Sequence, residues 1–230
     1  MITHVYTIRA LTNLHVGSSG TDYGIVDKLV QRDPATKFPT IHMSGIKGAL
    51  RQYFRDELKA DTREIFGSEV QDKAAKVKPG KVRFISADLL AFPCPSKSAQ
   101  AGKPFELMRC HKVAKEFDAK IALFTAWKDW AQNKLPRDKR ERDRQSEAFA
   151  ELTRNLPIVA RNYLNNGVSE NLWYEEFVPR EAVFATIIQG PKAQMKELQE
   201  IDGKVIQIGG NATVGYGYCL FTLENKTPEQ

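Results

Sequence analysis

The sequence has few cysteines and no long apolar run. Three cysteines occur in 230 residues, Cys94, Cys110 and Cys219, and no two of them form a C-x-x-C pair. This odd, scattered set argues against a disulfide framework and favours free thiols in a reducing compartment. His111 follows Cys110, but no second pair of metal ligands accompanies them, so we expect no zinc site.

No segment approaches the roughly 18 apolar residues of a membrane span. The first residues lack the basic and then apolar order of a secretory signal, and we expect a cytoplasmic protein.

The motifs of the common nucleotide-binding folds are also missing. No Gly-Lys-Ser/Thr triplet marks a Walker loop, and no G-x-G-x-x-G opens a helix. The sequence has no RNP-type run of alternating glycine and aromatic residues, so base stacking by an ordinary RNA-recognition motif is not indicated. These absences exclude the most familiar phosphate- and RNA-binding signatures.

The composition is that of an ordinary globular protein with a basic balance. Apolar residues make up 42% and charged residues 27%, and a chain of 230 residues can bury one sizeable core. The formal net charge is +6 and the isoelectric point is near 9.1. A basic balance is expected of a protein that binds polyanions. It favours a nucleic-acid partner without identifying one.

A glycine-rich segment lies near the C-terminus. Four glycines fall within nine residues of the sequence IGGNATVGYG at 208–217, between two strand-like runs. Glycine lets backbone N–H groups approach an anion closely, so the segment could bind the phosphate of a nucleotide or a nucleic acid. Taken alone, it is more typical of a turn that joins two strands.

Hydrophobic patterns predict alternating strands and helices. Residues 5–11 are rich in β-branched and aromatic side chains and predict a strand. Behind Ser44, which we expect to cap a helix, apolar residues recur at helical spacing up to Leu58. The charged run 134–144 indicates a solvated helix or a surface insertion. The other expected elements are a strand at 81–92, helices within 96–160 including 122–130, a hairpin of 159–164 and 172–178 around Asn165-Asn166-Gly167, a strand at 181–189, a short helix from Pro191 to Ile201 and a last strand at 216–223.

Without insertions, the order of elements is strand, helix, strand, strand, helix, strand. This order predicts an α+β fold with the split βαβ arrangement of ferredoxin-like and RRM-like domains. RNA-binding versions of that fold lay single strands across an open sheet face. Residues 15–43 show no sustained period, and loops of that length inside a domain are usually functional or disordered.

Several motifs follow one another from the first strand to the last. They are LHVG at 14–17, GIVD at 24–27, QRD at 31–33, SGIKGALR at 44–51, LWYEEFVP at 172–179 and QIGGNATVGYG at 207–217. In this order they resemble the RAMP superfamily, and within it the backbone subunits of Cmr-type (type III-B) CRISPR effector complexes. The resemblance spans the chain and is weak across about 100–155.

The resemblance implies a single domain over residues 1–230. It would combine an RNA-recognition-like palm, an active loop at about 15–43, a helical insertion at about 96–156 and a thumb hairpin at about 158–180. The insertion is short beside those of similar subunits. The family also implies a role in antiviral defence, with copies of the chain polymerising along guide crRNA among other effector subunits. Each thumb would interrupt the duplex between the guide and the target RNA.

The activity that the resemblance implies is divalent-metal-dependent cleavage of target RNA. Asp27 matches the position required for cutting in similar subunits. A carboxylate there can hold Mg²⁺ or Mn²⁺ against a phosphate, or help deprotonate a ribose 2′-hydroxyl. One carboxylate supplies few ligands, so we expect weak metal binding that RNA and water complete. His15 matches a second family position and could act as acid or base, or merely contact RNA or pack. Alternation on a strand turns only one of Glu175 and Glu176 toward RNA, and we expect Glu176.

The remaining candidates would bind the RNA backbone. A helix starting at Ser44 presents free N–H groups, and Lys47 and Arg51 lie one turn apart on the same face. Without the resemblance, these two side chains could be only solvated charges. The expected RNA-binding set is Arg32, Ser44, Lys47, Arg51, Trp173, Gly209, Gly210, Asn211, Thr213 and Gly215.

Three other functions stay open at this point. The chain could be a crRNA-binding scaffold without catalysis, or a metal-independent endoribonuclease that processes crRNA precursors. It could also bind mononucleotides and have no role with RNA.

Overall fold

A computed structural model describes residues 1–18, 26–68, 78–96 and 104–224. Residues 19–25 of the predicted active loop, which include Gly20 and Gly24, and residues 97–103 of the predicted insertion lie outside these ranges. None of the helices in the described ranges is long and apolar enough to cross a bilayer.

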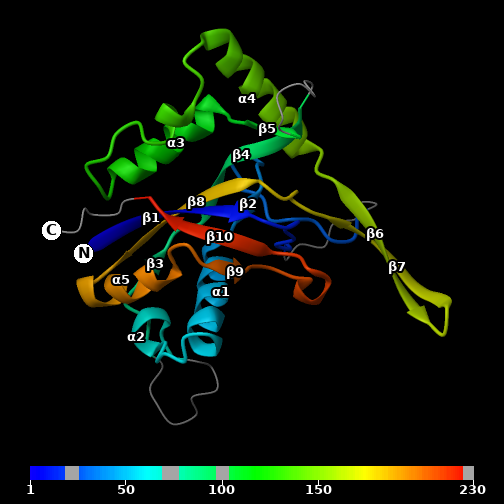
Figure 1. Cartoon of the computed structure of the whole chain (residues 1–230), viewed down its shortest axis with the longest axis horizontal. Coiled ribbons are helices and arrows are strands. Elements are labelled where there is room, and N and C mark those ends of the chain that lie inside the picture. The colour runs from blue at the N-terminus through cyan, green and yellow to red at the C-terminus, as the bar shows by residue number, and fades with distance from the viewer. Residues whose placement is uncertain (19–25, 69–77, 97–103, 225–230) are drawn as a thin grey trace.

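A large antiparallel sheet forms the centre of the molecule (Figure 1). Its main strands are β1 (Ile2–Ala10), β2 (Thr40–Ile41), β4 (Ala87–Pro95), β8 (Val183–Gly190), β9 (Val205–Gln207) and β10 (Tyr218–Leu223). They lie in the order β2-β4-β8-β1-β10-β9, while β3 (Arg83–Phe84) pairs with β8 and β5 (Phe105–Met108) with β4. The first and last strands of the chain therefore lie side by side, with Ile8 opposite Phe221.

The apolar residues of the central strand explain its place in the core. Val5, Tyr6 and Ile8 of β1 are fully buried, and the Tyr6 hydroxyl donates to the Leu198 carbonyl at 3.0 Å. This hydrogen bond satisfies a polar group that would be costly to bury alone. It also fastens β1 to the helix α5 (Lys192–Leu198), which is followed by the 3₁₀ turn η3 (Gln199–Ile201).

The helix α1 (Met43–Asp56) buries one face formed by Ile46, Leu50 and Phe54, as its spacing predicts. It is followed by the short α2 (Arg63–Phe66). The prediction that Ser44 caps α1 is wrong, because the cap residue is His42 and Ser44 lies within the first turn. The Gln31 side chain accepts from the His42 N–H at 2.8 Å, which holds the chain extended one residue before Met43.

A helical region covers one end of the sheet around β4 and β5 (Figure 1). It contains α3 (His111–Ala122), the 3₁₀ turn η2 (Gln132–Lys134) and α4 (Lys139–Arg154), with Asp138 capping α4. The helix predicted over 122–130 is absent, because α3 ends at Ala122 and turns follow. Trp127 and Trp130 pack partly buried against the core from these turns, so their spacing reflects tertiary packing.

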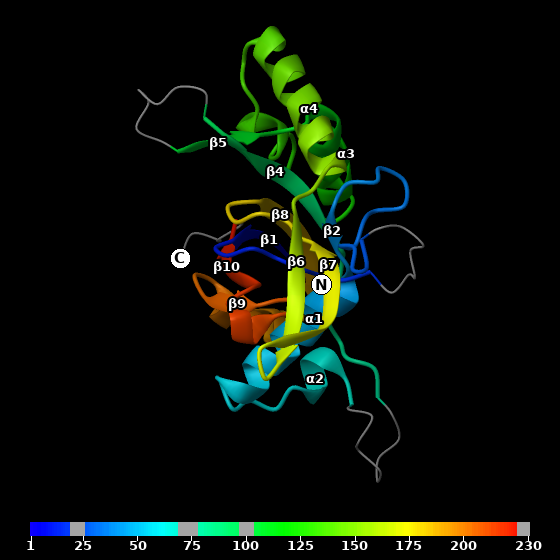
Figure 2. The same ribbon diagram turned by 90° about the vertical axis from the view of Figure 1, so that its right-hand side faces the viewer.

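A separate two-stranded ribbon projects from the sheet on the right of Figure 1. It consists of β6 (Ile158–Asn165) and β7 (Val168–Glu176). Asn166 and Gly167 both have positive φ, of 48° and 83°, which is the conformation of a tight hairpin turn. The turn signal in the sequence therefore coincides with the hairpin tip, and Figure 2 shows β6 and β7 running beside each other at the front of that view.

Candidate functional site

Three segments meet where the projecting hairpin joins the sheet. They are the loop at 26–33, the glycine-rich bend at 208–217, and the hairpin root, defined as residues 159–161 and 173–176. The loop runs along β7, because the Asp27 N–H donates to the Tyr174 carbonyl at 3.0 Å and the Glu176 N–H to the Lys28 carbonyl at 2.9 Å. The loop is thus fixed to the hairpin by backbone hydrogen bonds.

Asp27 is exposed at this junction. Its Oδ2 accepts the Tyr174 N–H at 2.7 Å, while no residue in the described ranges donates to Oδ1. The described residues include no group of three or more His, Cys, Asp or Glu side chains that could hold a metal ion. Among the described residues, Asp27 therefore offers a metal one carboxylate oxygen without a hydrogen-bond donor, which fits an ion whose other ligands come from RNA and water.

His15 lies beneath the same junction and is only 6% exposed. Its Nδ1 lies 2.6 Å from the Glu176 carbonyl oxygen. Because a carbonyl only accepts, Nδ1 carries a proton and donates, which leaves Nε2 for other contacts. Nε2 would lie only 3.1 Å from a Cβ at position 17, so Gly17 lets the ring fit beneath the loop.

Glu175 and Glu176 are both buried, so the prediction that one of them faces outward to RNA is wrong. The two side chains do point to opposite faces of β7, but each face is covered by another segment. Glu176 accepts from Arg32 at 2.6 Å and from the Val30 N–H at 3.0 Å. Its carboxylate therefore holds the loop at 30–32 and is not presented to solvent.

Two partly buried arginines of the expected RNA-binding set are also hydrogen-bonded to other parts of the protein. Besides Glu176, Arg32 donates to the Thr153 carbonyl at 2.7 Å and to the Lys37 carbonyl at 3.0 Å. Arg51 donates to the Phe66 carbonyl at 2.5 Å. Lys47 has no partner among the residues that the structure describes, so of the α1 pair only Lys47 is free for an anion.

The glycine-rich bend uses most of its N–H groups internally. Gly210 donates to the His15 carbonyl at 2.9 Å and Gly217 to the Asn13 carbonyl at 2.8 Å. Residues 214–216 donate to Asn211 and Ala212 in the 3₁₀ turn η4 (Ala212–Val214) and just after it. Among the described residues, the N–H groups of the bend without an acceptor are those of Gly209, Asn211, Ala212 and Thr213, so fewer donors are free than expected.

Trp173 and Arg161 lie on the hairpin face that turns toward the bend. The Lys28 ammonium lies 4.9 Å from the Trp173 ring centroid, and the Arg161 guanidinium lies 4.7 Å from that of Tyr216. No local sequence pattern indicates Arg161, because its partners Glu175 and Tyr216 lie on other segments of the chain. Trp173 stays a predicted RNA contact.

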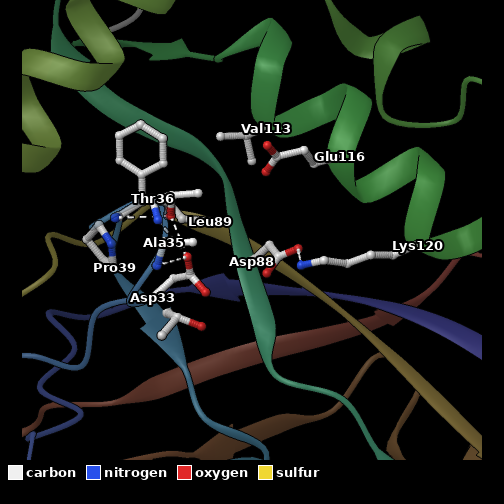
Figure 3. A pocket seen from close by; sticks show the side chains of 11 residues that line it. Asp33, Ala35, Thr36, Pro39, Asp88, Leu89, Val113, Glu116 and Lys120 are labelled. Carbon is white, nitrogen blue, oxygen red and sulfur yellow. Dashed lines mark hydrogen bonds and ion pairs between the residues drawn. The ribbon is translucent and has the colours of Figure 1, made fainter.

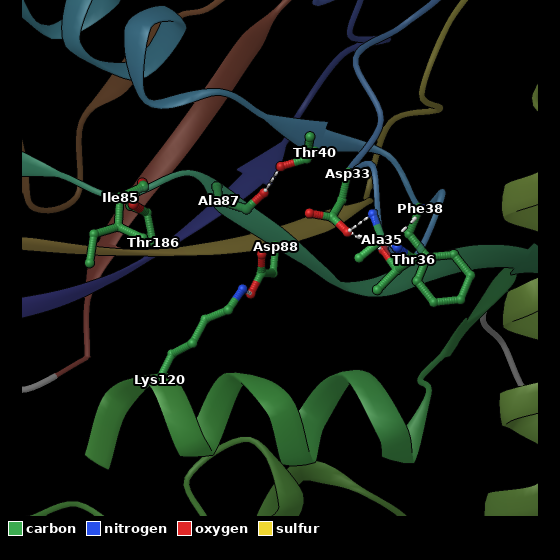
Figure 4. A network of polar contacts seen from close by, with 10 residues as sticks. All are labelled: Asp33, Ala35, Thr36, Phe38, Thr40, Ile85, Ala87, Asp88, Lys120 and Thr186. Atoms are coloured by element: carbon green, nitrogen blue, oxygen red, sulfur yellow. Dashed lines mark hydrogen bonds and ion pairs between the residues drawn. The ribbon is translucent and has the colours of Figure 1, made fainter. Parts of the chain in front are cut away.

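A separate hollow of about 320 Å³ lies between α3, β4 and the turn at 33–40 (Figure 3). Asp33 accepts from the Thr36 N–H at 2.8 Å, and Lys120 donates to Asp88 at 2.5 Å (Figure 4). Burial raises the pKa of Asp88, although Lys120 acts in the opposite direction. None of the predicted catalytic or RNA-binding residues lines this hollow. Its charges stabilise local turns and packing.

Known proteins resemble the chain over nearly its whole length. It is 29% identical, over an alignment of 290 residues, to the CRISPR system Cmr endoribonuclease Cmr4 of Pyrococcus furiosus, with 99% of this chain and 97% of that protein covered. The crystal structure of oligomeric Cmr4 from the same organism aligns with a TM-score of 0.70 at 22% identity, covering 96% of this chain and 98% of the other. A chain of the type III-B Cmr-beta complex bound to cognate target RNA aligns with a TM-score of 0.74 at 18% identity, with 97% of both chains covered.

The family model of the RAMP superfamily matches residues 7–220. This range runs from β1 to β10 and includes the loop, the hairpin root and the bend described above. The motifs that pointed to this family from the sequence alone lie within it. The chain belongs to the RAMP superfamily.

Proposed function

We propose that the chain is a Cmr4-like backbone subunit of a type III-B CRISPR effector complex. In this role it binds guide crRNA, associates with copies of itself and other effector subunits, and cleaves target RNA. The full-length similarity to a Cmr endoribonuclease supports this function, as do structural neighbours that are oligomeric or bound to target RNA. A cytoplasmic location is part of the same proposal.

The proposal includes a ferredoxin-like palm with the hairpin as its thumb. The strand order β10-β1-β8-β4, antiparallel throughout, supports it. So do α1, which follows β1, and α5, which follows β8. Such a sheet would carry the guide strand, while the projecting hairpin would contact the duplex of guide and target RNA.

The observation that carries the catalytic part is the position of Asp27. Its carboxylate lies at the hairpin root, with Oδ2 held by the Tyr174 N–H and Oδ1 free. A divalent ion such as Mg²⁺ or Mn²⁺ would stabilise charge on the scissile phosphate when bound. Asp27 would hold that ion weakly through Oδ1, or accept the proton of the attacking 2′-hydroxyl. The fixed Oδ2 orients the carboxylate for either task.

The test is Asp27→Asn in the assembled complex with crRNA and labelled target RNA. Asparagine keeps an oxygen that accepts the Tyr174 N–H but removes the charge. We expect unchanged target affinity and a loss of cleavage of at least about 100-fold, as for removal of a group that acts in proton transfer. Asp33→Asn makes the same change a few residues further on and should cleave normally, because Asp33 only holds a turn.

Unchanged cleavage by Asp27→Asn would reject Asp27 as the catalytic group. Wild-type complex that binds target RNA but never cuts it would instead support a scaffold. Chelation with EDTA should stop cleavage and added Mg²⁺ should restore it, whereas EDTA-resistant cutting would indicate metal-independent processing.

A further inference from the structure

Glu175 is the most deeply buried charged side chain of the hairpin root, at 0% exposure. Its Oε1 accepts a hydrogen bond from the Asn211 side-chain amide. The same oxygen lies 3.4 Å from Arg161 Nε and 3.9 Å from His15 Nδ1. Burying a carboxylate costs several kcal/mol unless partners surround it, so this residue depends on all three neighbours staying in place.

The three neighbours come from three different segments. Asn211 belongs to the glycine-rich bend, Arg161 to β6, and His15 to the segment after β1. Asn211 has a left-handed backbone, with φ of 63°, and Arg161 stacks on Tyr216 of the same bend. The hairpin is thus joined to the bend twice, through the carboxylate and through the guanidinium.

The residues on either side of Glu175 hold the two candidate catalytic groups. Tyr174 donates its N–H to Asp27, and Glu176 accepts from the His15 ring through its carbonyl. A displacement of residue 175 along the strand would therefore move both contacts. Among the described residues, β6 and β7 pair as strands only with each other, so the position of the hairpin depends on the contacts of its root with the loop and with the bend.

We propose that Glu175 and Asn211 form a positioning pair. Their contact fixes the hairpin against the glycine-rich bend, and through Tyr174 and Glu176 it fixes Asp27 and His15. Neither side chain contacts RNA in this role. The effect on cleavage rests on the proposed function, whereas the coupling between hairpin and bend is a property of the protein alone.

Amide hydrogen exchange on the full chain tests the coupling. We compare Glu175→Ala, Asn211→Ala and the double variant at 26–30 and 172–177, which are the segments joined by the Asp27 and Lys28 hydrogen bonds. Each single change should speed exchange there about tenfold, as for loss of one hydrogen bond to a charged group. The double variant should exchange about as fast as Glu175→Ala alone, because Glu175→Ala already removes the contact that Asn211→Ala breaks.

The hairpin tip supplies a matched control. Glu170 accepts from the Asn165 side chain at 2.6 Å, which is the same pair of residue types in an exposed position. Glu170→Ala should leave exchange at 26–30 unchanged. Glu175→Gln should largely restore protection relative to Glu175→Ala, because glutamine can still accept from Asn211. If Glu175→Ala fails to fold, Glu175→Gln replaces it, and the test then compares Glu175→Gln with Asn211→Ala.

The second readout is cleavage by the assembled complex. Asn211→Ala should lower kcat about tenfold while the Kd for target RNA stays within about twofold, because positioning is lost and binding is kept. Additive effects of the two alanine changes on exchange, or normal exchange in both single variants, would overturn the pair. A wild-type complex that does not cut RNA would refute the proposed cleavage activity. The exchange measurements would then still test the contact between Glu175 and Asn211.

Discussion

Arg32 and Glu176 form a largely shielded ion pair, with 24% and 8% of their side chains exposed. The guanidinium also binds two backbone carbonyls, one of them Thr153 at the end of α4. One arginine therefore joins the loop, the helical region and the hairpin root. Removing one member of such a pair leaves a shielded charge without its partner, which is more damaging than losing an exposed pair.

Glu176→Gln should lower the free energy of unfolding by about 2–3 kcal/mol, somewhat below the range for a fully buried pair because Arg32 is partly exposed. Urea unfolding of the free protein measures this. Glu181→Gln breaks the more exposed Arg9–Glu181 contact and should cost less than about 1 kcal/mol. Wild-type stability combined with lost cleavage in Glu176→Gln would show that this carboxylate acts on RNA.

For single residues, the sequence indicated which side chains are candidates for the site but not which partners they contact. The motifs singled out Asp27 and His15, and both residues are hydrogen-bonded to β7 at the hairpin root. The same motifs suggested free charges at Arg32 and Arg51, which are bound inside the protein. Glu176 lies 144 positions from Arg32, and no local pattern can reveal a partner at that distance.

Two glycines of the glycine-rich bend have nearly the same backbone conformation but different surroundings. Gly209 has φ of 81°, and a Cβ there would lie 2.3 Å from the His15 carbonyl oxygen. Gly215 has nearly the same φ, of 82°, but nothing lies within 4 Å of its Cβ position. Substitutions at these two positions therefore distinguish the cost of a left-handed backbone from the cost of a steric clash.

Gly215→Ala should destabilise the protein by about 1 kcal/mol, the cost of a left-handed alanine. Gly209→Ala should cost clearly more, because the bend must also move away from His15. Thermal unfolding of both variants gives the comparison. Equal losses would mean that the bend is not pressed against His15 and that only the backbone conformation matters.

Elements were predictable from the sequence where local signals sufficed. The apolar spacing of α1 and the Asn166-Gly167 pair are such signals. Helix faces and tight turns depend on residues close in sequence, so local patterns predict them. The prediction of a helix over 122–130 was wrong, because Trp127 and Trp130 pack against the core from turns and their spacing does not reflect a helix face. No local pattern indicates the strand pairing, because β1 pairs with strands near positions 190 and 220, so the prediction of a split βαβ sheet depended on the order of elements alone.

The whole molecule carries a net charge of +6, but its cations differ in how free they are. Lys47 on α1 is partly exposed and has no partner among the described residues, whereas Arg51 on the same helix is held by the Phe66 carbonyl. A cation releases counterions when it contacts a phosphate, and a side chain that the protein does not hold elsewhere can turn to make that contact. The salt dependence of RNA binding should therefore distinguish residues that hold RNA from residues that hold the fold.

We expect the affinity of the protein for single-stranded RNA to fall steeply as salt rises. Lys47→Gln should reduce the slope of log K against log salt by about 0.7, the contribution of one phosphate contact on a single strand. Arg51→Gln should leave the slope unchanged and lower the melting temperature. Lys128→Gln removes the same charge from an exposed residue of the helical region and should also leave the slope unchanged. Titrations at four or five salt concentrations would measure all three variants. If Lys47→Gln behaved like Lys128→Gln, the amino end of α1 would not hold the RNA backbone, and the guide strand would have to follow another path across the sheet.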